Sequence, residues 1–301
     1  MGKEAEHSFT RYLLAKQSVD DRALNREVYA RLTSSLPDGQ LRIIEVGAGI
    51  GTMLTRLLCW RLFTRAEYVL VDALPENSMF AAEWLPDWAR ENGMKVEAVA
   101  ANRLRLHDEQ RQVNVQIEQA DVFDFIRSAP EPADLLVAHA FLDLLPMPES
   151  LRGLFSLLNP GGLAWFTLNF DGVSSLEPPI EPGLDRKIEQ LYHQSMDTRP
   201  NGGDSQCGRH LFGHIAGLGA SILAAGSSDW VVHAVRGQYP GDEAYFLQHI
   251  LSFFEHSLGD QSELDKETFQ RWLSKRRSQV ERGELVYIAH QLDFLVKPAG
   301  V

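Results

Sequence analysis

Three glycines stand at alternate positions directly after an apolar run that begins at Leu41: Gly47, Gly49 and Gly51. Glycine has no Cβ atom, so its backbone adopts positive φ readily and can approach a ligand closely. A helix predicted over residues 52–63 follows, and its free N–H groups and positive dipole end face the same loop. This arrangement is typical of a turn that binds a nucleotide. A glycine-rich surface turn is the alternative interpretation of the segment by itself.

Two carboxylates have positions that suit a nucleotide. Asp72 ends a second apolar run, over residues 67–72, and follows Gly47 by 25 positions (72 − 47). An acid at about this distance binds ribose hydroxyls in nucleotide-binding folds. Glu45 precedes Gly47 by two residues. The dinucleotide fingerprint G-x-G-x-x-G has one residue more before its last glycine than this loop has, so an NAD-dependent oxidoreductase is a disfavoured alternative.

The acid and the G-x-G-x-G spacing resemble the first motif of the class I S-adenosylmethionine-dependent methyltransferases. The resemblance continues in three later segments, which are a third strand over 115–123, a fourth over 133–141, and an L-x-P-G-G-like turn within 157–168. These ordered segments cover residues 41–168. The resemblance implies an α/β fold with a doubly wound, Rossmann-like sheet of seven strands, of which the last is antiparallel.

The resemblance also implies the cofactor, S-adenosylmethionine, with S-adenosylhomocysteine as its product. Asp72 would then bind the ribose, and Asp121 would contact the adenine amino group. The residues expected to contact the cofactor lie in the glycine loop and at strand ends: Glu45, Gly47, Ala48, Gly49, Gly51, Asp72, Ala73, Asp121, Val122 and His139.

Three side chains follow the fourth predicted strand, where an open α/β sheet binds its ligands: His139, Phe141 and Asp143. An imidazole accepts a proton near neutral pH, so His139 is the candidate general base. A histidine held by a backbone carbonyl or by the cofactor is the alternative. Methyl transfer from a sulfonium mainly requires alignment and exclusion of water, so a base is not obligatory.

A second group of candidates for binding the acceptor lies in the glycine-containing segment 202–210: Asp204, Arg209 and His210. The planar guanidinium of Arg209 suits a carboxylate or a phosphate. Alternatively, Asp204 caps the helix that follows.

Residues 1–40 are predicted to form a helical cap. Ser18 and Asp21 resemble a capping box, and an apolar stripe with four-residue spacing follows them. Arg11, Tyr12 and Lys16 precede that helix. They either close over the cofactor as a lid, with Tyr12 in the acceptor pocket, or belong to a segment that merely covers the sheet edge.

The remaining chain completes a single compact domain. Residues 41–170 form the cofactor-binding core, and residues 171–301 complete the sheet and add helical insertions on the substrate side. Alternating residues within 96–106 predict an added β-hairpin before the third strand. Two amphipathic segments, over 246–254 and 264–273, form an insertion before the last strand. Their aromatic stripes are either core residues or a substrate wall.

Composition restricts the partners. The chain has 301 residues, 44% of them apolar, and a net charge of −12 that disfavours a nucleic acid as partner. Its two cysteines form no C-x-x-C pair, so neither a disulfide framework nor a metal site is predicted. No apolar run approaches the roughly 20 residues of a membrane helix, and we expect no membrane association and a cytoplasmic location.

These observations favour a methyltransferase for a small-molecule acceptor. The segment Ala138-His139-Ala140-Phe141 departs from the patterns of methyltransferases that act on nucleic-acid bases. Methylation of oxygen, nitrogen or carbon stays open, and a monomer or a homodimer is expected. A protein that binds S-adenosylmethionine without turnover is the main alternative, since a fold alone does not establish a function.

Overall fold

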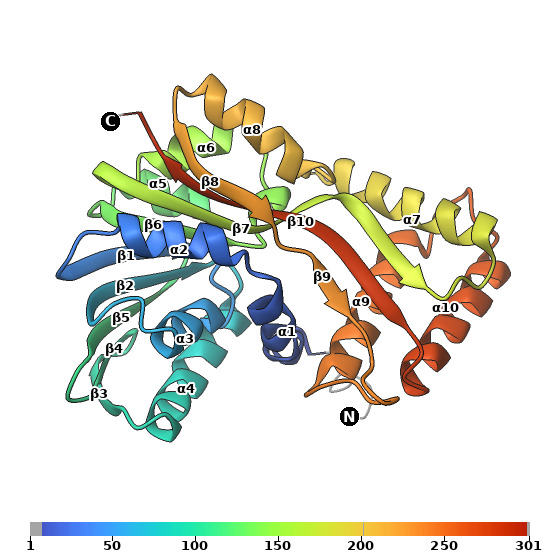
Figure 1. The fold of residues 1–301 in the computed structure, drawn as a ribbon, viewed down its shortest axis with the longest axis horizontal. Coiled ribbons are helices and arrows are strands. Elements are labelled where there is room, and N and C mark those ends of the chain that lie inside the picture. Colours follow the sequence, from blue (N-terminus) through green and yellow to red (C-terminus); the bar gives the residue numbers. More distant parts are fainter. Residues whose placement is uncertain (1–7, 201, 300–301) are drawn as a thin grey trace.

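A twisted β-sheet forms the centre of the computed structural model, which describes residues 8–200 and 202–299 (Figure 1). Within these residues the sheet contains ten strands. In spatial order they are β3 (Lys95–Ala100), β4 (Arg103–His107), β5 (Gln112–Gln119), β2 (Arg65–Asp72), β1 (Gln40–Val46), β6 (Ala133–His139), β7 (Leu158–Glu177), β10 (Val286–Lys297) and β8 (Ser221–Ser227), and β9 (Trp230–Val232) pairs with β10.

The path from β5 to β8 is the predicted doubly wound sheet of seven strands. Strands β5, β2, β1, β6 and β7 run parallel, and β10 is antiparallel to both of its neighbours. The predicted hairpin is present as β3 and β4, which extend the edge beyond β5. Strand β9 is a further addition. It forms because β10 extends past the end of β8 and offers residues 287–289 as a second pairing segment.

Helices cover both faces of the sheet. On one side lie α1 (Phe9–Ala23), α2 (Arg26–Ser35), α3 (Thr52–Cys59), α4 (Pro75–Glu91), α7 (Pro182–Asp197), α9 (Glu243–Leu258) and α10 (Lys266–Glu281), and on the other α5 (Val122–Arg127), α6 (Glu149–Phe155) and α8 (Cys207–Gly217). Consecutive strand residues such as Ile43 and Ile44 are both fully buried, but in different core clusters. A parallel sheet covered on two sides requires such continuous apolar strands.

The N-terminal part of the chain differs from its prediction in one respect. Ser18 and Asp21 lie inside α1 and do not start a helix. The helix that follows, α2, is capped by Asn25, whose side chain accepts hydrogen bonds from two backbone N–H groups. The predicted capping box is therefore wrong, because the helix already begins at Phe9. Residues 1–7 of the predicted cap lie outside the described residues.

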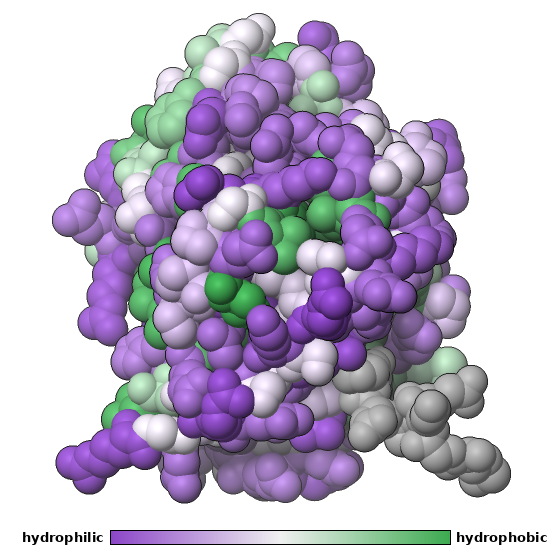
Figure 2. All heavy atoms as spheres, turned by 90° about the vertical axis from the view of Figure 1, so that its right-hand side faces the viewer, coloured by the Kyte–Doolittle hydropathy of each residue, from purple (hydrophilic) through white to green (hydrophobic). Residues whose placement is uncertain are grey.

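Two long strands carry the second half of the structure. Strand β7 has 20 residues and β10 has 12, and both extend beyond the core toward α7, α9 and α10 (Figure 1). The aromatic residues Phe246 and Phe254 of α9 are fully buried. Figure 2 shows the end of the molecule where α7 and α10 lie, and its surface is mostly hydrophilic. No helix in residues 8–200 and 202–299 is long and apolar enough to cross a membrane.

A buried carboxylate joins α7 to α10. Asp185 accepts hydrogen bonds from the Trp272 indole at 2.6 Å and from Arg276 Nη2 at 2.7 Å, while its other oxygen accepts from the backbone N–H groups of Ile180 and Glu181. The Arg276 side chain is fully buried. The pair therefore holds the two helices in one relative position.

We expect Asp185→Ala to lower the free energy of unfolding by about 3–5 kcal/mol, because it leaves the buried Arg276 guanidinium without its carboxylate. Urea denaturation measures the change. Asp87→Ala, which removes an exposed carboxylate paired with Arg90, is the control and should cost less than about 1 kcal/mol. Equal losses in both variants would show that the buried pair does not stabilise the α7–α10 contact.

Candidate functional site

A cavity of about 710 Å³ opens at the carboxyl ends of the central parallel strands. One part is lined by the glycine loop, by Asp72 and by Asp121, and we name it the glycine-loop lobe. The other part is lined by aromatic side chains from α1, β7, α7, β9, α9 and β10. We name it the aromatic lobe, with walls formed by Tyr12, Phe170, Tyr192, Trp230, Phe253 and Tyr287. Open α/β sheets bind ligands at this edge.

The glycine loop adopts the backbone that its sequence predicts. The φ angles are 63° at Gly47, 56° at Gly49 and 84° at Gly51, values that residues with a Cβ atom rarely adopt. A Cβ atom on Gly47 would lie 2.3 Å from the Phe141 ring, so this ring packs directly on the loop. Gly47, Ala48 and Gly49 line the cavity. Gly51 instead packs α3 against Leu70 of β2.

Asp72 organises the loop from the end of β2. Its Oδ2 accepts from the Gly49 N–H at 2.7 Å, and its Oδ1 accepts from the Leu74 N–H and from Asn77 Nδ2. Burial raises the pKa of this carboxyl, and the three hydrogen bonds oppose that shift. Asn77 also lines the cavity, and its buried Oδ1 has no partner among the described residues. Asn77 lies in the first turn of α4, which begins at Pro75.

The other residues predicted for the cofactor also line the cavity. Glu45 is 1% exposed and accepts from the Tyr68 hydroxyl at 2.7 Å, and burial raises its pKa to about 8 against the effect of this hydrogen bond. Asp121 caps α5 by accepting from the Phe123 N–H at 2.8 Å. Ala73 and Val122 complete this side of the glycine-loop lobe.

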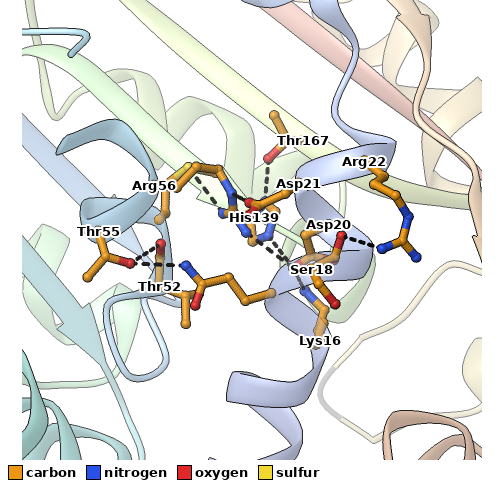
Figure 3. Close-up of polar contacts among 12 residues, drawn as sticks. Lys16, Ser18, Asp20, Asp21, Arg22, Thr52, Thr55, Arg56, His139 and Thr167 are labelled. Carbon is orange, nitrogen blue, oxygen red and sulfur yellow. Dashed lines mark hydrogen bonds and ion pairs between the residues drawn. The ribbon is translucent and has the colours of Figure 1, made fainter. Parts of the chain in front are cut away.

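A buried carboxylate from α1 forms the centre of a polar cluster beside the cavity (Figure 3). Asp20 Oδ2 accepts from Lys16 Nζ at 2.6 Å and lies 2.9 Å from His139 Nε2, while Oδ1 accepts from the Trp230 indole at 2.9 Å. Arg56 Nη2 lies 3.8 Å from Oδ2. Burial alone would raise the pKa of Asp20, but its cationic neighbours outweigh burial and hold the pKa below its ordinary value.

His139 uses both ring nitrogens within this cluster. Nε2 faces the Asp20 carboxylate, which can only accept, so Nε2 carries the proton. Nδ1 lies 2.8 Å from Thr167 Oγ1 and then accepts from that hydroxyl. Burial and the nearby Lys16 ammonium lower the pKa of His139 to about 4. The ring lines the cavity, but its lone pair is already engaged, and this geometry disfavours the general-base interpretation.

Helix α1 closes the cavity and is attached to the insertion helix α9. The Tyr12 ring stacks on His249 with centroids 4.4 Å apart, and Arg22 donates two hydrogen bonds to Glu243. Tyr12 and Lys16 line the cavity, as the lid hypothesis requires. Arg11, which the sequence placed in the same segment, instead forms an exposed ion pair with α9's N-cap residue Asp242.

Of the residues proposed for the acceptor, Phe141 and Asp143 line the cavity, whereas Asp204, Arg209 and His210 do not. Arg209 Nε donates to Asp171 Oδ1 at 2.8 Å, and His210 Nδ1 lies 2.7 Å from Asp204 Oδ2. Asp204 and His210 line a separate pocket near Pro146. The prediction that residues 202–210 bind the acceptor therefore lies outside the large cavity, and β7 supplies Arg209 with a carboxylate, that of Asp171.

We expect the His139 ring to stay neutral between pH 5.5 and 8, because its pKa is lowered to about 4. Proton NMR, with assignment from His139→Gln, measures this, and the urea-unfolded chain is the control because its histidines titrate near 6.5. The unfolded state then binds a proton before the native state, so stability decreases as pH falls from about 6.5 to about 4. A midpoint near 6.5 in the folded protein would restore the general-base interpretation.

Known proteins resemble this chain in structure. No protein-family model matches the sequence, and a search of curated proteins finds no significant match. A candidate methyltransferase from Bacillus halodurans matches with a TM-score of 0.51 and 11% identity over 91% of this chain and 100% of that one. A candidate type II methyltransferase from Anaeromyxobacter dehalogenans matches with 0.50 and 14% over 92% and 97%. The chain therefore shares the Rossmann-like fold of these two structures.

Proposed function

We propose that this chain is an S-adenosylmethionine-dependent methyltransferase that acts on a small-molecule acceptor. The observation that carries the proposal is the single cavity that joins the glycine-loop lobe to the aromatic lobe beneath α1. A methyltransferase must hold two reactants end to end, whereas a protein that only binds the cofactor has no need of a second lobe. The volume of about 710 Å³ falls in the range of small-molecule sites.

The residues of the glycine-loop lobe suit the nucleoside part of S-adenosylmethionine. The Asp72 carboxylate and the unpartnered Asn77 Oδ1 are hydrogen-bond acceptors at the end of β2, where ribose hydroxyls would need them. Gly47 and Gly49 have no Cβ atoms, and this allows the positive φ with which the loop backbone can approach a ligand closely. Asp121, at the end of the neighbouring β5, would accept from the adenine amino group.

The protein's own contribution to the reaction is alignment and dehydration. When bound, S-adenosylmethionine supplies a methyl group on a sulfonium, which is already activated for transfer. The side chains of Tyr12 and Trp230 would exclude water from the path between the two lobes, and this exclusion favours an in-line approach of the acceptor. His139 then positions α1 through Asp20. Asp143, whose carboxyl pKa is raised by burial, is the cavity residue placed to receive an acceptor proton.

Calorimetry with the purified chain tests the cofactor assignment directly. We expect S-adenosylmethionine and S-adenosylhomocysteine to bind and NAD not to bind. Incubation with S-adenosylmethionine and a metabolite extract should then yield S-adenosylhomocysteine, detected by mass spectrometry. Binding without product across acceptor-rich extracts would favour a catalytically silent protein, and tighter binding of NAD would contradict the proposal.

We expect Asp72→Asn to weaken S-adenosylmethionine binding by roughly 1–3 kcal/mol, because an amide cannot accept from two ribose hydroxyls and the Gly49 N–H together. Asp38→Ala is the matched control, since Asp38 is exposed just before β1. Calorimetry compares the affinities, and thermal denaturation shows whether both variants remain folded. An unchanged affinity in folded Asp72→Asn would remove Asp72 from the cofactor site.

A further inference from the structure

One arginine faces the aromatic lobe from the end of α7. Arg199 lies three residues after Met196 and seven after Tyr192, and all three side chains line the cavity. Tyr192 and Met196 lie four residues apart on one face of α7, and Arg199 follows the helix, two residues after its last residue Asp197. Tyr192 is held in place by stacking on Phe254, with ring centroids 3.9 Å apart. The position of this face of α7 relative to the cavity is thus determined by packing.

The guanidinium of Arg199 has an unused donor. Its Nη1 is buried and has no hydrogen-bond partner within residues 8–200 and 202–299, and Arg199 forms no ion pair with another residue in these ranges. Arg199 is half-buried, but a buried N–H without an acceptor has lost its hydrogen bond to water, and that loss is compensated only when a partner is supplied. In a cavity wall the ligand can be that partner.

The other charged groups that line the cavity near the aromatic lobe do not compensate Arg199. Lys16 is already paired with Asp20. Asp143 lies close enough to interact with Arg199 electrostatically, but within residues 8–200 and 202–299 the two side chains form neither a hydrogen bond nor an ion pair. His256, from the end of α9, adds a neutral or positive group. The lobe therefore presents to its ligand an arginine Nη1 donor that has no acceptor among the described residues.

The rest of the lobe is suited to an apolar body with one further polar group. Its walls are the aromatic side chains named above, which stabilise a ring by burial and stacking. On its floor, Gln291 of β10 is 3% exposed, and its Oε1 has no partner among the described residues. A ligand that fills this lobe would contact the aromatic walls and the polar atoms of Arg199 and Gln291.

We propose that the methyl acceptor is an aromatic or otherwise apolar molecule with an anionic group, and that Arg199 binds this group. The proposal rests on the proposed function, which identifies the aromatic lobe as the acceptor site. Carboxylates and phosphates share the required chemistry, because both accept two parallel hydrogen bonds from a guanidinium. Arg199 is then the residue that determines specificity for the acceptor's charge.

Calorimetry with three probes that share one naphthalene ring tests the proposal on the full chain. The probes are 2-naphthoate, 2-naphthyl phosphate and the neutral 2-naphthamide. We expect at least one anion to bind about 10- to 100-fold more tightly than the amide, as a charge-assisted pair provides. The tighter of the two anions distinguishes a carboxylate acceptor from a phosphate acceptor. Equal binding of all three probes, or no binding of either anion at millimolar concentration, would overturn the proposal.

Variants assign the preference to Arg199. Arg199→Met replaces the guanidinium by a shorter, unbranched apolar side chain and should abolish the preference for the anion without weakening the binding of the amide, whereas Arg199→Lys should retain part of the preference. Arg186→Met is the matched control, because Arg186 is exposed on α7 and does not line the cavity. A preference that survives in Arg199→Met would place the anion elsewhere and contradict the inference.

A parallel titration with S-adenosylhomocysteine separates this inference from the proposed function. Binding of S-adenosylhomocysteine without any preference for the anionic probes contradicts only the acceptor inference. An anion preference that depends on Arg199, in a chain that binds no S-adenosylhomocysteine, contradicts the proposed function and leaves an anion site in the aromatic lobe.

Discussion

The Asp20 carboxylate is the interaction on which the candidate site depends. It lies in α1, yet it accepts from Lys16 on its own helix, from His139 at the end of β6 and from Trp230 in β9. A buried carboxylate is tolerated only when its partners surround it, and removing one partner is strongly destabilising. The three elements must therefore meet in one arrangement. That arrangement places α1 over the strand ends and closes the cavity.

The backbone is strained at two positions that line the cavity. Ala140 and Leu168 both line it, and both have positive φ, 49° and 55°, without being glycine. Such conformations persist only where neighbours impose them. The Leu168 N–H donates to Asp293 Oδ1 at 2.8 Å, and the other oxygen of Asp293 accepts from the Asn25 N–H that starts α2. A second buried carboxylate thus holds the N-terminal helices and the strained strand together.

Features that depend on neighbouring residues could be predicted from the sequence, and those that depend on distant ones could not. The glycine loop and the order of strands follow from local patterns, and the structure confirms the predicted fold. Ser18 and Asp21 have the spacing of a capping box, but Ser18 donates to Glu243, 225 residues later. Asp20 has one local partner, Lys16 four residues earlier, but its other partners come from β6 and β9. A short-range pattern cannot distinguish a cap from a long-range contact.

Two arginines, Arg209 and Arg199, show that the sequence does not reveal which arginine the fold pairs with a carboxylate. The sequence predicted Arg209 as a ligand for the acceptor because it lies among glycines and polar residues, yet β7 places Asp171 beside it. Arg199 has an ordinary sequence environment and no such partner in the described ranges. In a chain with 41 acidic and 29 basic residues, a carboxylate is available to most arginines. An arginine is therefore free to bind a ligand only where the fold leaves one of its donors without an acceptor, and Arg199 Nη1 in the cavity wall is such a donor among the described residues.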